Sequence, residues 1–227
     1  MSLISVIIPT LNAGETIDET LACIAPYCSD LVREIIVSDG GSKDDTVARA
    51  RRAGCTVVEG SHSRGVQLAQ GAALSEGAWL LFVHADTHLS ENWANQVRAF
   101  IKRAETTGRA ATFEFALSDL SFMARILERI VAVRVWLFAL PYGDQGLLIH
   151  RQFYLALGGY RLLPLMEDVD FVRRIGRSRL EVLPVRAFTS AVRYQREGYL
   201  KRMARNALCI SLYFVGVPPH FIARIYD

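Results

Sequence analysis

The sequence contains little cysteine, and the arrangement fits neither a metal site nor a disulfide framework. It has four cysteines, with no CxxC pair and no histidine at zinc-ligand spacing: Cys23, Cys28, Cys55 and Cys209. We therefore expect free thiols in a reducing compartment, and the pattern excludes a zinc-stabilised or disulfide-stabilised domain.

Long apolar runs, a leader segment and basic clusters are missing as well. No uninterrupted apolar segment reaches the roughly 20 residues that a membrane-spanning helix needs. The chain opens directly into the strand-like Ile4–Pro9 without a basic leader, so we expect no signal peptide and a cytoplasmic protein. The net charge is +3, and no segment combines clustered Lys and Arg with interleaved aromatics, so we expect no nucleic-acid partner.

What the sequence has in quantity is apolar residues in short runs. With 227 residues, 51% of them hydrophobic, the chain can bury a sizeable core, and without a repeat or linker it is expected to form a single domain over residues 1–227. Four runs rich in apolar residues predict buried strands at Ile4–Ile8, Glu34–Ser38, Cys55–Val58 and Trp79–Val83. Helical patterns follow the first three, at Ala13–Ala25, Lys43–Ala53 and Gly65–Ser75. This alternation predicts an α/β fold, a mostly parallel central sheet flanked by helices.

The second half is less regular. Further strands are predicted at Ala110–Leu117, Leu147–His150 and Leu180–Leu183. Helices are predicted at Leu120–Leu140, Glu167–Ile175 and Tyr199–Val217, the last as a C-terminal helical extension that stops at Pro218 and Pro219.

Polar residues follow three of the first four strands at the point where each strand ends. The segments are Pro9–Asn12, Asp39–Ser42 and His84–Thr87. Because the carboxyl ends of parallel strands meet at one edge of a sheet, where ligands bind, this convergence predicts a ligand site.

Asp39 opens a glycine-containing turn, in which Gly40 lets the backbone approach a ligand closely. Its carboxylate would accept hydrogen bonds from a nucleobase or ribose. Ser42 and Asp45, three residues apart, are interpreted as a helix cap. Asp39 has no comparable structural explanation in the sequence.

Two other acidic positions are candidates for chemistry. Asp86 lies at the mouth of an apolar strand, where a carboxylate suits a hard cation such as Mg²⁺; the alternative is that it caps a helix starting near Ser90. Glu167 and Asp168 begin a predicted helix, where the helix dipole favours acidic residues. The residues alone leave open whether Asp168 serves the helix or acts as a general base.

Four segments together resemble family 2 of the glycosyltransferases, which have the GT-A fold. They are Ser5–Asn12, Glu34–Ser42, His84–Asp86 and Glu167–Asp168, and their order and spacing match over residues 4–175. Shorter pieces, Arg64–Gly65, Gly143–Gln145 and Thr189–Ala191, are similar to one small bacterial, non-processive branch of that family.

The resemblance implies transfer of a sugar from a nucleotide-diphosphate-sugar to an acceptor hydroxyl, assisted by Mn²⁺ or Mg²⁺, with inversion at the anomeric carbon. Asp86 matches the last carboxylate of the family's DxD motif and would hold the metal ion. Asp168, with Glu167 beside it, matches the acid that deprotonates the acceptor. The implied nucleotide-sugar contacts are Pro9, Thr10, Asn12, Asp39, Gly40, Arg64, Asp144 and Gln145. Residues up to about 118 would form the nucleotide-sugar-binding half, and residues from about 119 to 227 the acceptor-side half.

Two departures narrow the implied activity. His84 replaces the first carboxylate of DxD, and the QxxRW motif of processive synthases is missing, which favours transfer of a single sugar. Two alternatives stay open: a non-catalytic protein that binds a nucleotide-sugar or lipid, and another Mg²⁺-dependent nucleotide-processing α/β enzyme. The second would carry a basic Gly-rich loop or an acidic pair after the first strand, where this chain has Pro9–Asn12.

The helical segments Leu120–Leu140 and Tyr199–Val217 are more apolar than a solvent-facing helix needs. We interpret them as packing on each other or on a homodimer partner, since apolar helix stripes are usually core. The alternative is peripheral contact with the inner face of the membrane, with basic residues toward anionic headgroups. The donor base, the sugar and the acceptor are not indicated by any residue.

Overall fold

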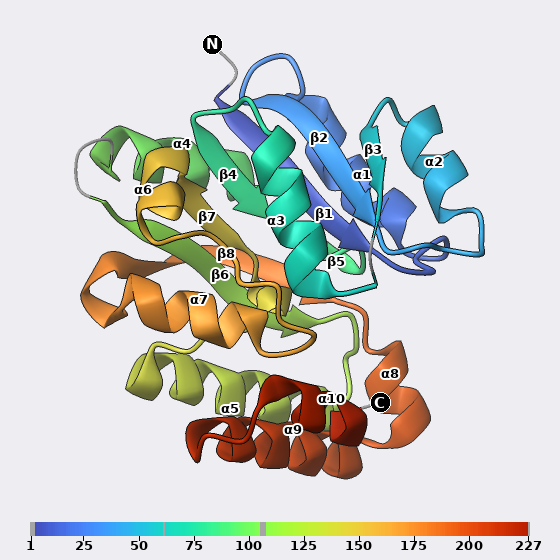
Figure 1. Ribbon diagram of the computed structural model, residues 1–227, viewed down its shortest axis with the longest axis vertical. Coiled ribbons are helices and arrows are strands. Elements are labelled where there is room, and N and C mark those ends of the chain that lie inside the picture. The colour runs from blue at the N-terminus through green and yellow to red at the C-terminus, as the bar shows by residue number, and fades with distance from the viewer. Residues whose placement is uncertain (1–2, 61, 105–107, 227) are drawn as a thin grey trace.

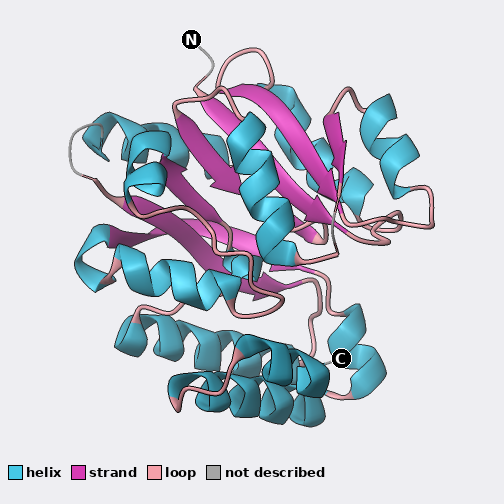
Figure 2. Cartoon of the chain, viewed as in Figure 1, coloured by secondary structure: helices cyan, strands magenta, loops and turns pink. Residues whose placement is uncertain are grey.

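The short apolar runs of the first half lie side by side in one eight-stranded sheet. The computed structural model describes residues 3–60, 62–104 and 108–226. Its strands are β1 (Ile4–Thr10), β2 (Val32–Asp39), β3 (Thr56–Glu59), β4 (Trp79–Phe82), β5 (Thr87–Leu89), β6 (Ala110–Leu117), β7 (Leu147–His150) and β8 (Leu180–Thr189). Every residue of β1 and β4 is buried, because helices cover both faces of the sheet (Figures 1 and 2).

The strand order is β3-β2-β1-β4-β7-β6-β8-β5. Strands β3, β2, β1 and β4 are parallel to one another, as are β6 and β8, whereas β7 is antiparallel to both neighbours and β5 is antiparallel to β8. Thr10 pairs with Asp39 at one end of the sheet, and Thr87 pairs with Thr189. Polar residues from distant parts of the chain therefore meet at the edge where the parallel strands end.

Ten helices are described: α1 (Ile17–Ile24), α2 (Thr46–Arg52), α3 (Arg64–Leu74), α4 (Trp93–Ala104), α5 (Phe122–Phe138), α6 (Arg151–Ala156), α7 (Glu167–Ile175), α8 (Val192–Glu197), α9 (Tyr199–Phe214) and α10 (Pro219–Tyr226). One core cluster contains Leu21 of α1 and Phe100 of α4. The other contains Leu68 of α3 and Phe171 of α7. The two clusters lie on opposite faces of the sheet, because neighbouring residues of β1, Val6 and Ile7, belong one to each.

Helices α5, α9 and α10 form a separate layer below α7 at the lower end of Figure 1. The start of α9 packs through Met203 on a core cluster formed largely by buried residues of α5. Its later part packs through Ile210 on buried residues of α7. The outer face stays open: Phe122 is 78% exposed and Trp136 is 73% exposed. No helix in the described part of the chain is long and apolar enough to cross a membrane.

The predicted α/β sheet is confirmed, and two element predictions are wrong. Strand β8 does not end at Leu183 but continues to Thr189. Leu183 pairs with Phe113, and Arg186 pairs with the residue that follows Phe113, so the register shifts between these two pairs. Pro184 falls in the resulting β-bulge, where the missing N–H group of proline breaks no ladder hydrogen bond. Pro219 does not only end the helical tail. It begins α10, because proline suits the first turn of a helix.

Candidate active site

The carboxylate of Asp39 is the hub of the loop that follows β2. Its side chain is 1% exposed. Oδ1 accepts hydrogen bonds from Thr10 Oγ1 (2.9 Å) and Ser42 Oγ (2.5 Å), and Oδ2 accepts from the amides of Gly41 (2.8 Å) and Ser42 (2.7 Å). Burial raises the pKa of Asp39, but these bonds outweigh it and lower the pKa. The expectation that Asp39 lacks a structural role is wrong, since four donors fill its two oxygens.

Ser42 supports this loop and does not cap a helix. Its Oγ accepts a hydrogen bond from the amide of Asn12 at 2.8 Å, and Asn12 Oδ1 in turn accepts from the amide of Lys43 at 2.8 Å. Asn12 has a φ of 49°, a left-handed conformation that asparagine tolerates. The loops after β1 and β2 are thereby joined.

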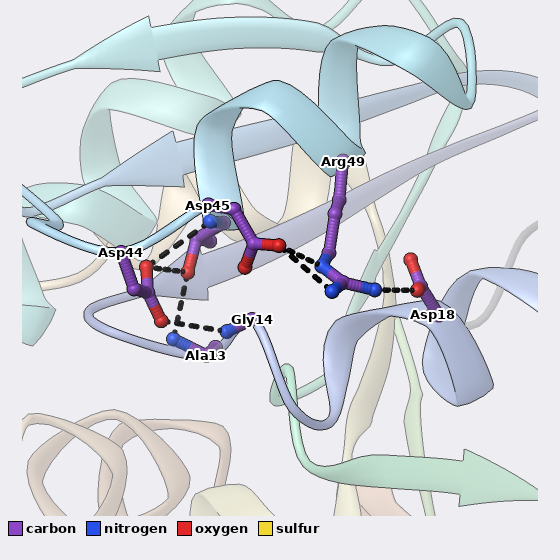
Figure 3. Close-up of polar contacts among 7 residues, drawn as sticks. Ala13, Gly14, Asp18, Asp44, Asp45 and Arg49 are labelled. Carbon is purple, nitrogen blue, oxygen red and sulfur yellow. Dashed lines mark hydrogen bonds and ion pairs between the residues drawn. The ribbon is translucent and has the colours of Figure 1, made fainter.

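The start of α2 is held by Asp44, which corrects the predicted Ser42–Asp45 cap. Asp44 Oδ1 accepts from the Thr46 amide at 3.1 Å, and Asp44 Oδ2 accepts from the Gly14 amide at 2.9 Å (Figure 3). The amide of Ala13 donates to Thr46 Oγ1 at 2.8 Å. Asp44 accepts from an amide two residues ahead, which is a local turn, whereas the predicted cap joins residues three apart.

Gln67 of α3 fixes the backbone where β1 and β2 end. Its Nε2 donates to the carbonyl oxygens of Thr10 (2.6 Å) and Ser38 (3.0 Å). A Cβ atom on Gly40 would lie 2.8 Å from this nitrogen, so glycine is required there for close approach. Gln67 was not predicted, and its signal in the sequence is only a polar residue within an apolar helix.

A cavity at the ends of β4 and β8 brings together five of the predicted residues. Arg64, Asp86, Asp144, Glu167 and Asp168 all line it. The predicted contacts that do not line this cavity are Pro9, Thr10, Asn12, Asp39, Gly40 and Gln145. All of these except Gln145 lie at the ends of β1 and β2 or in the loops that follow them.

Asp168 faces the turn of residues 143–145, a single turn of 3₁₀ helix. Its Oδ2 accepts a hydrogen bond from the amide of Gly143 at 2.7 Å. A Cβ on Gly143 would lie 2.5 Å from His84 Nε2, so the glycine lets His84 approach this turn, whereas the same Cβ would lie at an ordinary contact distance of 3.5 Å from Asp168 Oδ2. Burial lowers the pKa of His84 well below its usual value, and Arg64 and Arg193 lower it further, so His84 is neutral.

Asp144 is a half-buried acid with an acceptor oxygen that is not used. Burial raises its pKa to about 6; Asp168 and Asp86 raise it as well, against the opposite effects of Arg134 and Arg64. Its Oδ1 is buried and has no hydrogen-bond partner among the described residues. Uncompensated negative charge and an empty acceptor are the features of a site that binds a cation or a donor-rich ligand.

Glu167 is 1% exposed, and its carboxylate is more deeply buried than any other in the cavity. Burial raises its pKa to about 7, Arg64 lowers it and Asp168 raises it. Arg64 Nη1 lies 3.6 Å from Glu167 Oε1, which is beyond hydrogen-bond distance, and within the described chain that oxygen has no hydrogen-bond partner. Glu167 therefore titrates near neutral pH.

Asp86 carries little structural duty. Within the described residues its carboxylate accepts one long hydrogen bond, from Thr87 Oγ1 at 3.5 Å, while its carbonyl oxygen accepts from the Ser190 amide at 3.0 Å. Helix α4 begins at Trp93, so the alternative of a helix cap is wrong. No group of three His, Cys, Asp or Glu in the described ranges is placed to hold a metal ion. Mg²⁺ typically uses only one or two protein carboxylates and completes its shell with substrate phosphate and water.

The family model for glycosyl transferase family 2 matches residues 5–159, more than half of the sequence. The chain belongs to this family. The match spans β1 to α6, with Asp39, Asp86 and Asp144, and it ends before Glu167 and Asp168.

Curated relatives are bacterial members that match part of the chain. Glucosyl-3-phosphoglycerate synthase of Mycolicibacterium paratuberculosis is 37% identical over 92 residues, 37% of this chain and 28% of the relative. A PGL/p-HBAD biosynthesis glycosyltransferase of Mycobacterium bovis is 31% identical over 157 residues, 60% of each chain. The chain thus spans under a third of the first relative's length and 60% of the second's.

Solved structures share the fold. Glucosyl-3-phosphoglycerate synthase of Mycobacterium tuberculosis, in complex with Mn²⁺, UDP and glucosyl-3-phosphoglycerate, has a TM-score of 0.59 at 22% identity and covers 96% of this chain and 81% of its own. S. aureus TarS has a TM-score of 0.62 at 17% identity, over 99% and 69% of the two chains. The predicted GT-A fold is confirmed.

In this family member, Gln145 lies behind the cavity wall. It is 2% exposed, its Nε2 donates to the carbonyl oxygen of Phe113 at 2.9 Å, and its Oε1 accepts from Arg134 at 3.4 Å. The side chain thereby fixes the turn that carries Gly143 and Asp144.

Sequence reasoning missed a whole side of the cavity. The missed residues come from the last three helices: Arg193, Tyr194, Arg202, Asn206, Cys209 and Tyr226. They are spread over two predicted loops and one helix, so no periodic pattern groups them. A signal was present only in Arg202, an arginine on the same helix face as Cys209 and Asn206.

Proposed function

We propose that the protein is a glycosyltransferase that moves one sugar from a nucleotide-diphosphate-sugar to an acceptor hydroxyl. The observation that carries this proposal is the convergence of Asp86, Asp168 and Arg64 in one cavity beside the loops after β1 and β2. Acids and a cation that come together in one cavity from distant parts of the sequence are typical of a ligand site.

The nucleotide would bind at the loops that Asp39 and Gln67 organise, with Pro9, Thr10, Asn12 and Gly40 bordering it. Because the Asp39 carboxylate is already filled by four donors, we assign it the task of shaping the loop, and contact with the base requires one donor to be released. Arg64, at the start of α3, would lie against the phosphates, where a guanidinium binds oxygen pairs. Asp144 and Gln145 contribute through the turn they form.

A divalent cation fits the residues that are present. Asp86 would hold it, and the unpartnered Oδ1 of Asp144 is a second oxygen in the same cavity. Such an ion supplies Lewis-acid stabilisation of the negative charge on the leaving diphosphate. The solved relative that contains Mn²⁺ and UDP makes these the first ligands to test.

Asp168 is the base in this proposal. The Gly143 amide holds its Oδ2, which fixes the carboxylate at the cavity wall, and His84 in contact with Gly143 stays neutral and does not compete for the proton. Asp168 removes the acceptor proton as the oxygen attacks the anomeric carbon, and attack from the face opposite the diphosphate inverts that centre. Glu167, which is protonated in part at neutral pH, would donate a hydrogen bond to the substrate.

Two alternative functions remain to be distinguished. A non-catalytic nucleotide-sugar or lipid-binding protein has no use for an acid that titrates near pH 7 in its cavity, and another Mg²⁺-dependent nucleotide enzyme would lack sugar transfer. The test is calorimetry with UDP and three other nucleoside diphosphates in the presence of Mn²⁺, followed by release of nucleotide from the matching nucleotide-sugar. We expect Asp86→Ala to abolish Mn²⁺-dependent binding without loss of fold, and Glu91→Gln, an exposed control, to change nothing. Unchanged binding in Asp86→Ala would remove Asp86 from the site.

We also propose that the outer face of the helical layer contacts an anionic membrane surface. Exposed apolar side chains lie on all three helices, including Phe122, Trp136, Leu200 and Phe221, and Arg129, Lys201 and Arg224 are exposed on the same helices. Basic residues beside apolar ones suit anionic headgroups. Flotation with anionic and neutral vesicles tests this, and the expected result is salt-sensitive binding to the anionic vesicles. Absence of binding together with a dimer in sedimentation would assign the face to a second copy of the chain.

A further inference from the structure

The cavity that holds Asp168 ends at a wall built by α8, α9 and α10. The wall residues are Arg193, Tyr194, Arg202, Asn206, Cys209 and Tyr226. The nucleotide-side residues Thr10 and Asp39 do not line this cavity. The helices of the wall lie below the sheet in Figure 1, away from α2 and β3, so this part of the cavity is left for a ligand other than the nucleotide.

Arg202 makes this wall a fixed structure. It is 6% exposed, its Nη1 donates to Glu197 Oε1 at 2.7 Å and its Nη2 donates to the Tyr226 hydroxyl at 3.2 Å. Its guanidinium also lies 5.2 Å from the centre of the Tyr194 ring. The three helices are therefore tied together around one buried arginine, and α10 is part of the site rather than a loose tail.

Asn206 presents an unused acceptor on this wall. Its Nδ2 donates to the Tyr194 hydroxyl at 3.5 Å, whereas its Oδ1 is buried and, within the described residues, has no hydrogen-bond partner. A buried carbonyl oxygen without a donor destabilises the folded chain, and a ligand hydroxyl or amine that reaches it removes that penalty. The oxygen thus selects for a ligand that carries a hydrogen-bond donor.

Arg193 presents an unpaired cation to the same cavity. Three arginines line the cavity. Arg64 lies beside Glu167 and Arg202 is bonded to Glu197, but Arg193 forms no ion pair with any described residue. An unpaired guanidinium at a cavity rim suits a carboxylate or phosphate.

We propose that this wall is the acceptor subsite and that it takes a small hydroxy compound bearing a carboxylate or phosphate. Arg193 binds the anionic group, and Asn206 Oδ1 accepts a hydroxyl of the same molecule. Another hydroxyl is then presented to Asp168. The inference rests on the proposed function, because a hydroxyl beside Asp168 is useful only if that residue deprotonates an acceptor.

The experiment is calorimetry on the full chain saturated with Mn²⁺ and UDP. The probes are glycerol, glycerol 3-phosphate, glycerate and inorganic phosphate, so that the hydroxyl, the phosphate and the carboxylate are tested separately. We expect at least one of the two anionic hydroxy compounds to bind on the order of tenfold tighter than glycerol and than inorganic phosphate, the value expected when a charge-assisted hydrogen bond is added. Arg193→Gln should abolish that preference, and Arg196→Gln, on the same helix and outside the cavity, should keep it.

Asn206→Leu should weaken the anionic hydroxy compounds by about fivefold, the size of one neutral hydrogen bond, and leave inorganic phosphate unchanged. Asn206→Ala is the second variant if the leucine prevents folding. Equal affinity for glycerol and its anionic counterparts overturns the inference. The inference is also overturned if Arg193→Gln weakens the binding of UDP and leaves the binding of the probes unaffected, because Arg193 would then bind the diphosphate. Failure of the wild-type chain to bind any nucleoside diphosphate with Mn²⁺ contradicts the proposed function first, and this inference with it.

Discussion

Arg64 Nη1 lies 3.6 Å from Glu167 Oε1, so a carboxylate that is 1% exposed is faced by a guanidinium that does not quite reach it. Burial holds the pKa of Arg64 down, but Glu167, Asp168 and other negative neighbours outweigh this effect and raise it, so the arginine is charged throughout the physiological range. Burial dominates for the acid and raises the pKa of Glu167 to about 7. Glu167 therefore keeps a proton inside the cavity up to near-neutral pH, and the folded state loses stability when that proton is released at higher pH.

This imbalance predicts the pH dependence of stability. The folded-state pKa of Glu167 is above its unfolded value of 4.5, so the folded state binds the proton more tightly and stability falls as pH rises from about 4.5 to about 7. Glu167→Gln removes this loss. We expect its melting temperature to exceed that of the wild type at pH 8, by an amount equivalent to on the order of 1 kcal/mol, and to match it near pH 4.5. Thermal unfolding at both pH values measures this, and the exposed Glu91→Gln should show no pH-dependent difference.

Asp168→Asn separates chemistry from binding. The amide oxygen of asparagine can still accept from Gly143, so the fold and the affinity for Mn²⁺ and nucleotide should be kept, whereas turnover should fall by about 10²-fold or more because the general base is lost. Steady-state kinetics and calorimetry give the two quantities. The matched control is Asp170→Asn on the same helix, which should retain turnover. Near-normal turnover in Asp168→Asn would transfer the role of base to Glu167 or Asp144.

Asp170→Asn should lower stability instead. Asp170 Oδ1 accepts from Arg161 at 2.9 Å and Oδ2 accepts from Arg174 at 2.7 Å, and the side chain is buried. Loss of one member of a buried charged network leaves the arginines uncompensated, and we expect a loss of about 3 kcal/mol. Urea denaturation measures it, and a loss under 1 kcal/mol would mean that the two arginines are solvated rather than held by this acid.

Asp39→Asn should weaken the nucleotide-side loop more than any single contact suggests. Its two oxygens accept four hydrogen bonds. In asparagine one of these oxygens is replaced by an NH₂ group, which is itself a donor and cannot accept from the donors that face it. An expected loss of about 1–3 kcal/mol follows from leaving buried donors unsatisfied. Thr10→Val removes one donor only and should cost less. If both variants lose the same stability, the Asp39 carboxylate is not the group that holds the loop together.

Gly143→Ala tests the close approach of His84 to the turn of residues 143–145. The new Cβ would lie 2.5 Å from His84 Nε2, so the imidazole or the turn must move. We expect turnover to fall by at least tenfold with a small change in melting temperature, because the displaced groups line an open cavity. Gly158→Ala, where a Cβ meets no atom within 4 Å but φ is 78°, controls for backbone strain alone. Normal turnover in Gly143→Ala would show that His84 is free to shift without effect.

The sheet and the acids at its edge could be predicted from the sequence, because strand period and strand ends are local properties. Asp168 shows where that reasoning stops. The sequence could not distinguish an acid favoured only by the helix dipole from a general base. The contact that orients the Asp168 carboxylate is a hydrogen bond from the amide of Gly143, which is 25 residues away in the chain. Asp39 was interpreted as free of structural duty because Thr10, one of its donors, is 29 residues away. The wall around Arg202 was missed altogether, because its helices are tied together by contacts between side chains and follow no shared period.

The pairing of β5 with β8 has a consequence for how the chain acquires its activity. Thr87 Oγ1 lies 3.0 Å from Thr189 Oγ1, a contact across 102 positions, and the Ser190 amide donates to the carbonyl oxygen of Asp86. During synthesis the loops after β1 and β2 can form early from neighbouring segments, but the backbone of Asp86 is fixed only after β8 has emerged and joined the sheet. Contacts of such long sequence separation slow folding, because loop closure must precede them. The cavity is therefore assembled last, and a chain stopped before β8 would carry the loops after β1 and β2 without the rest of the proposed site.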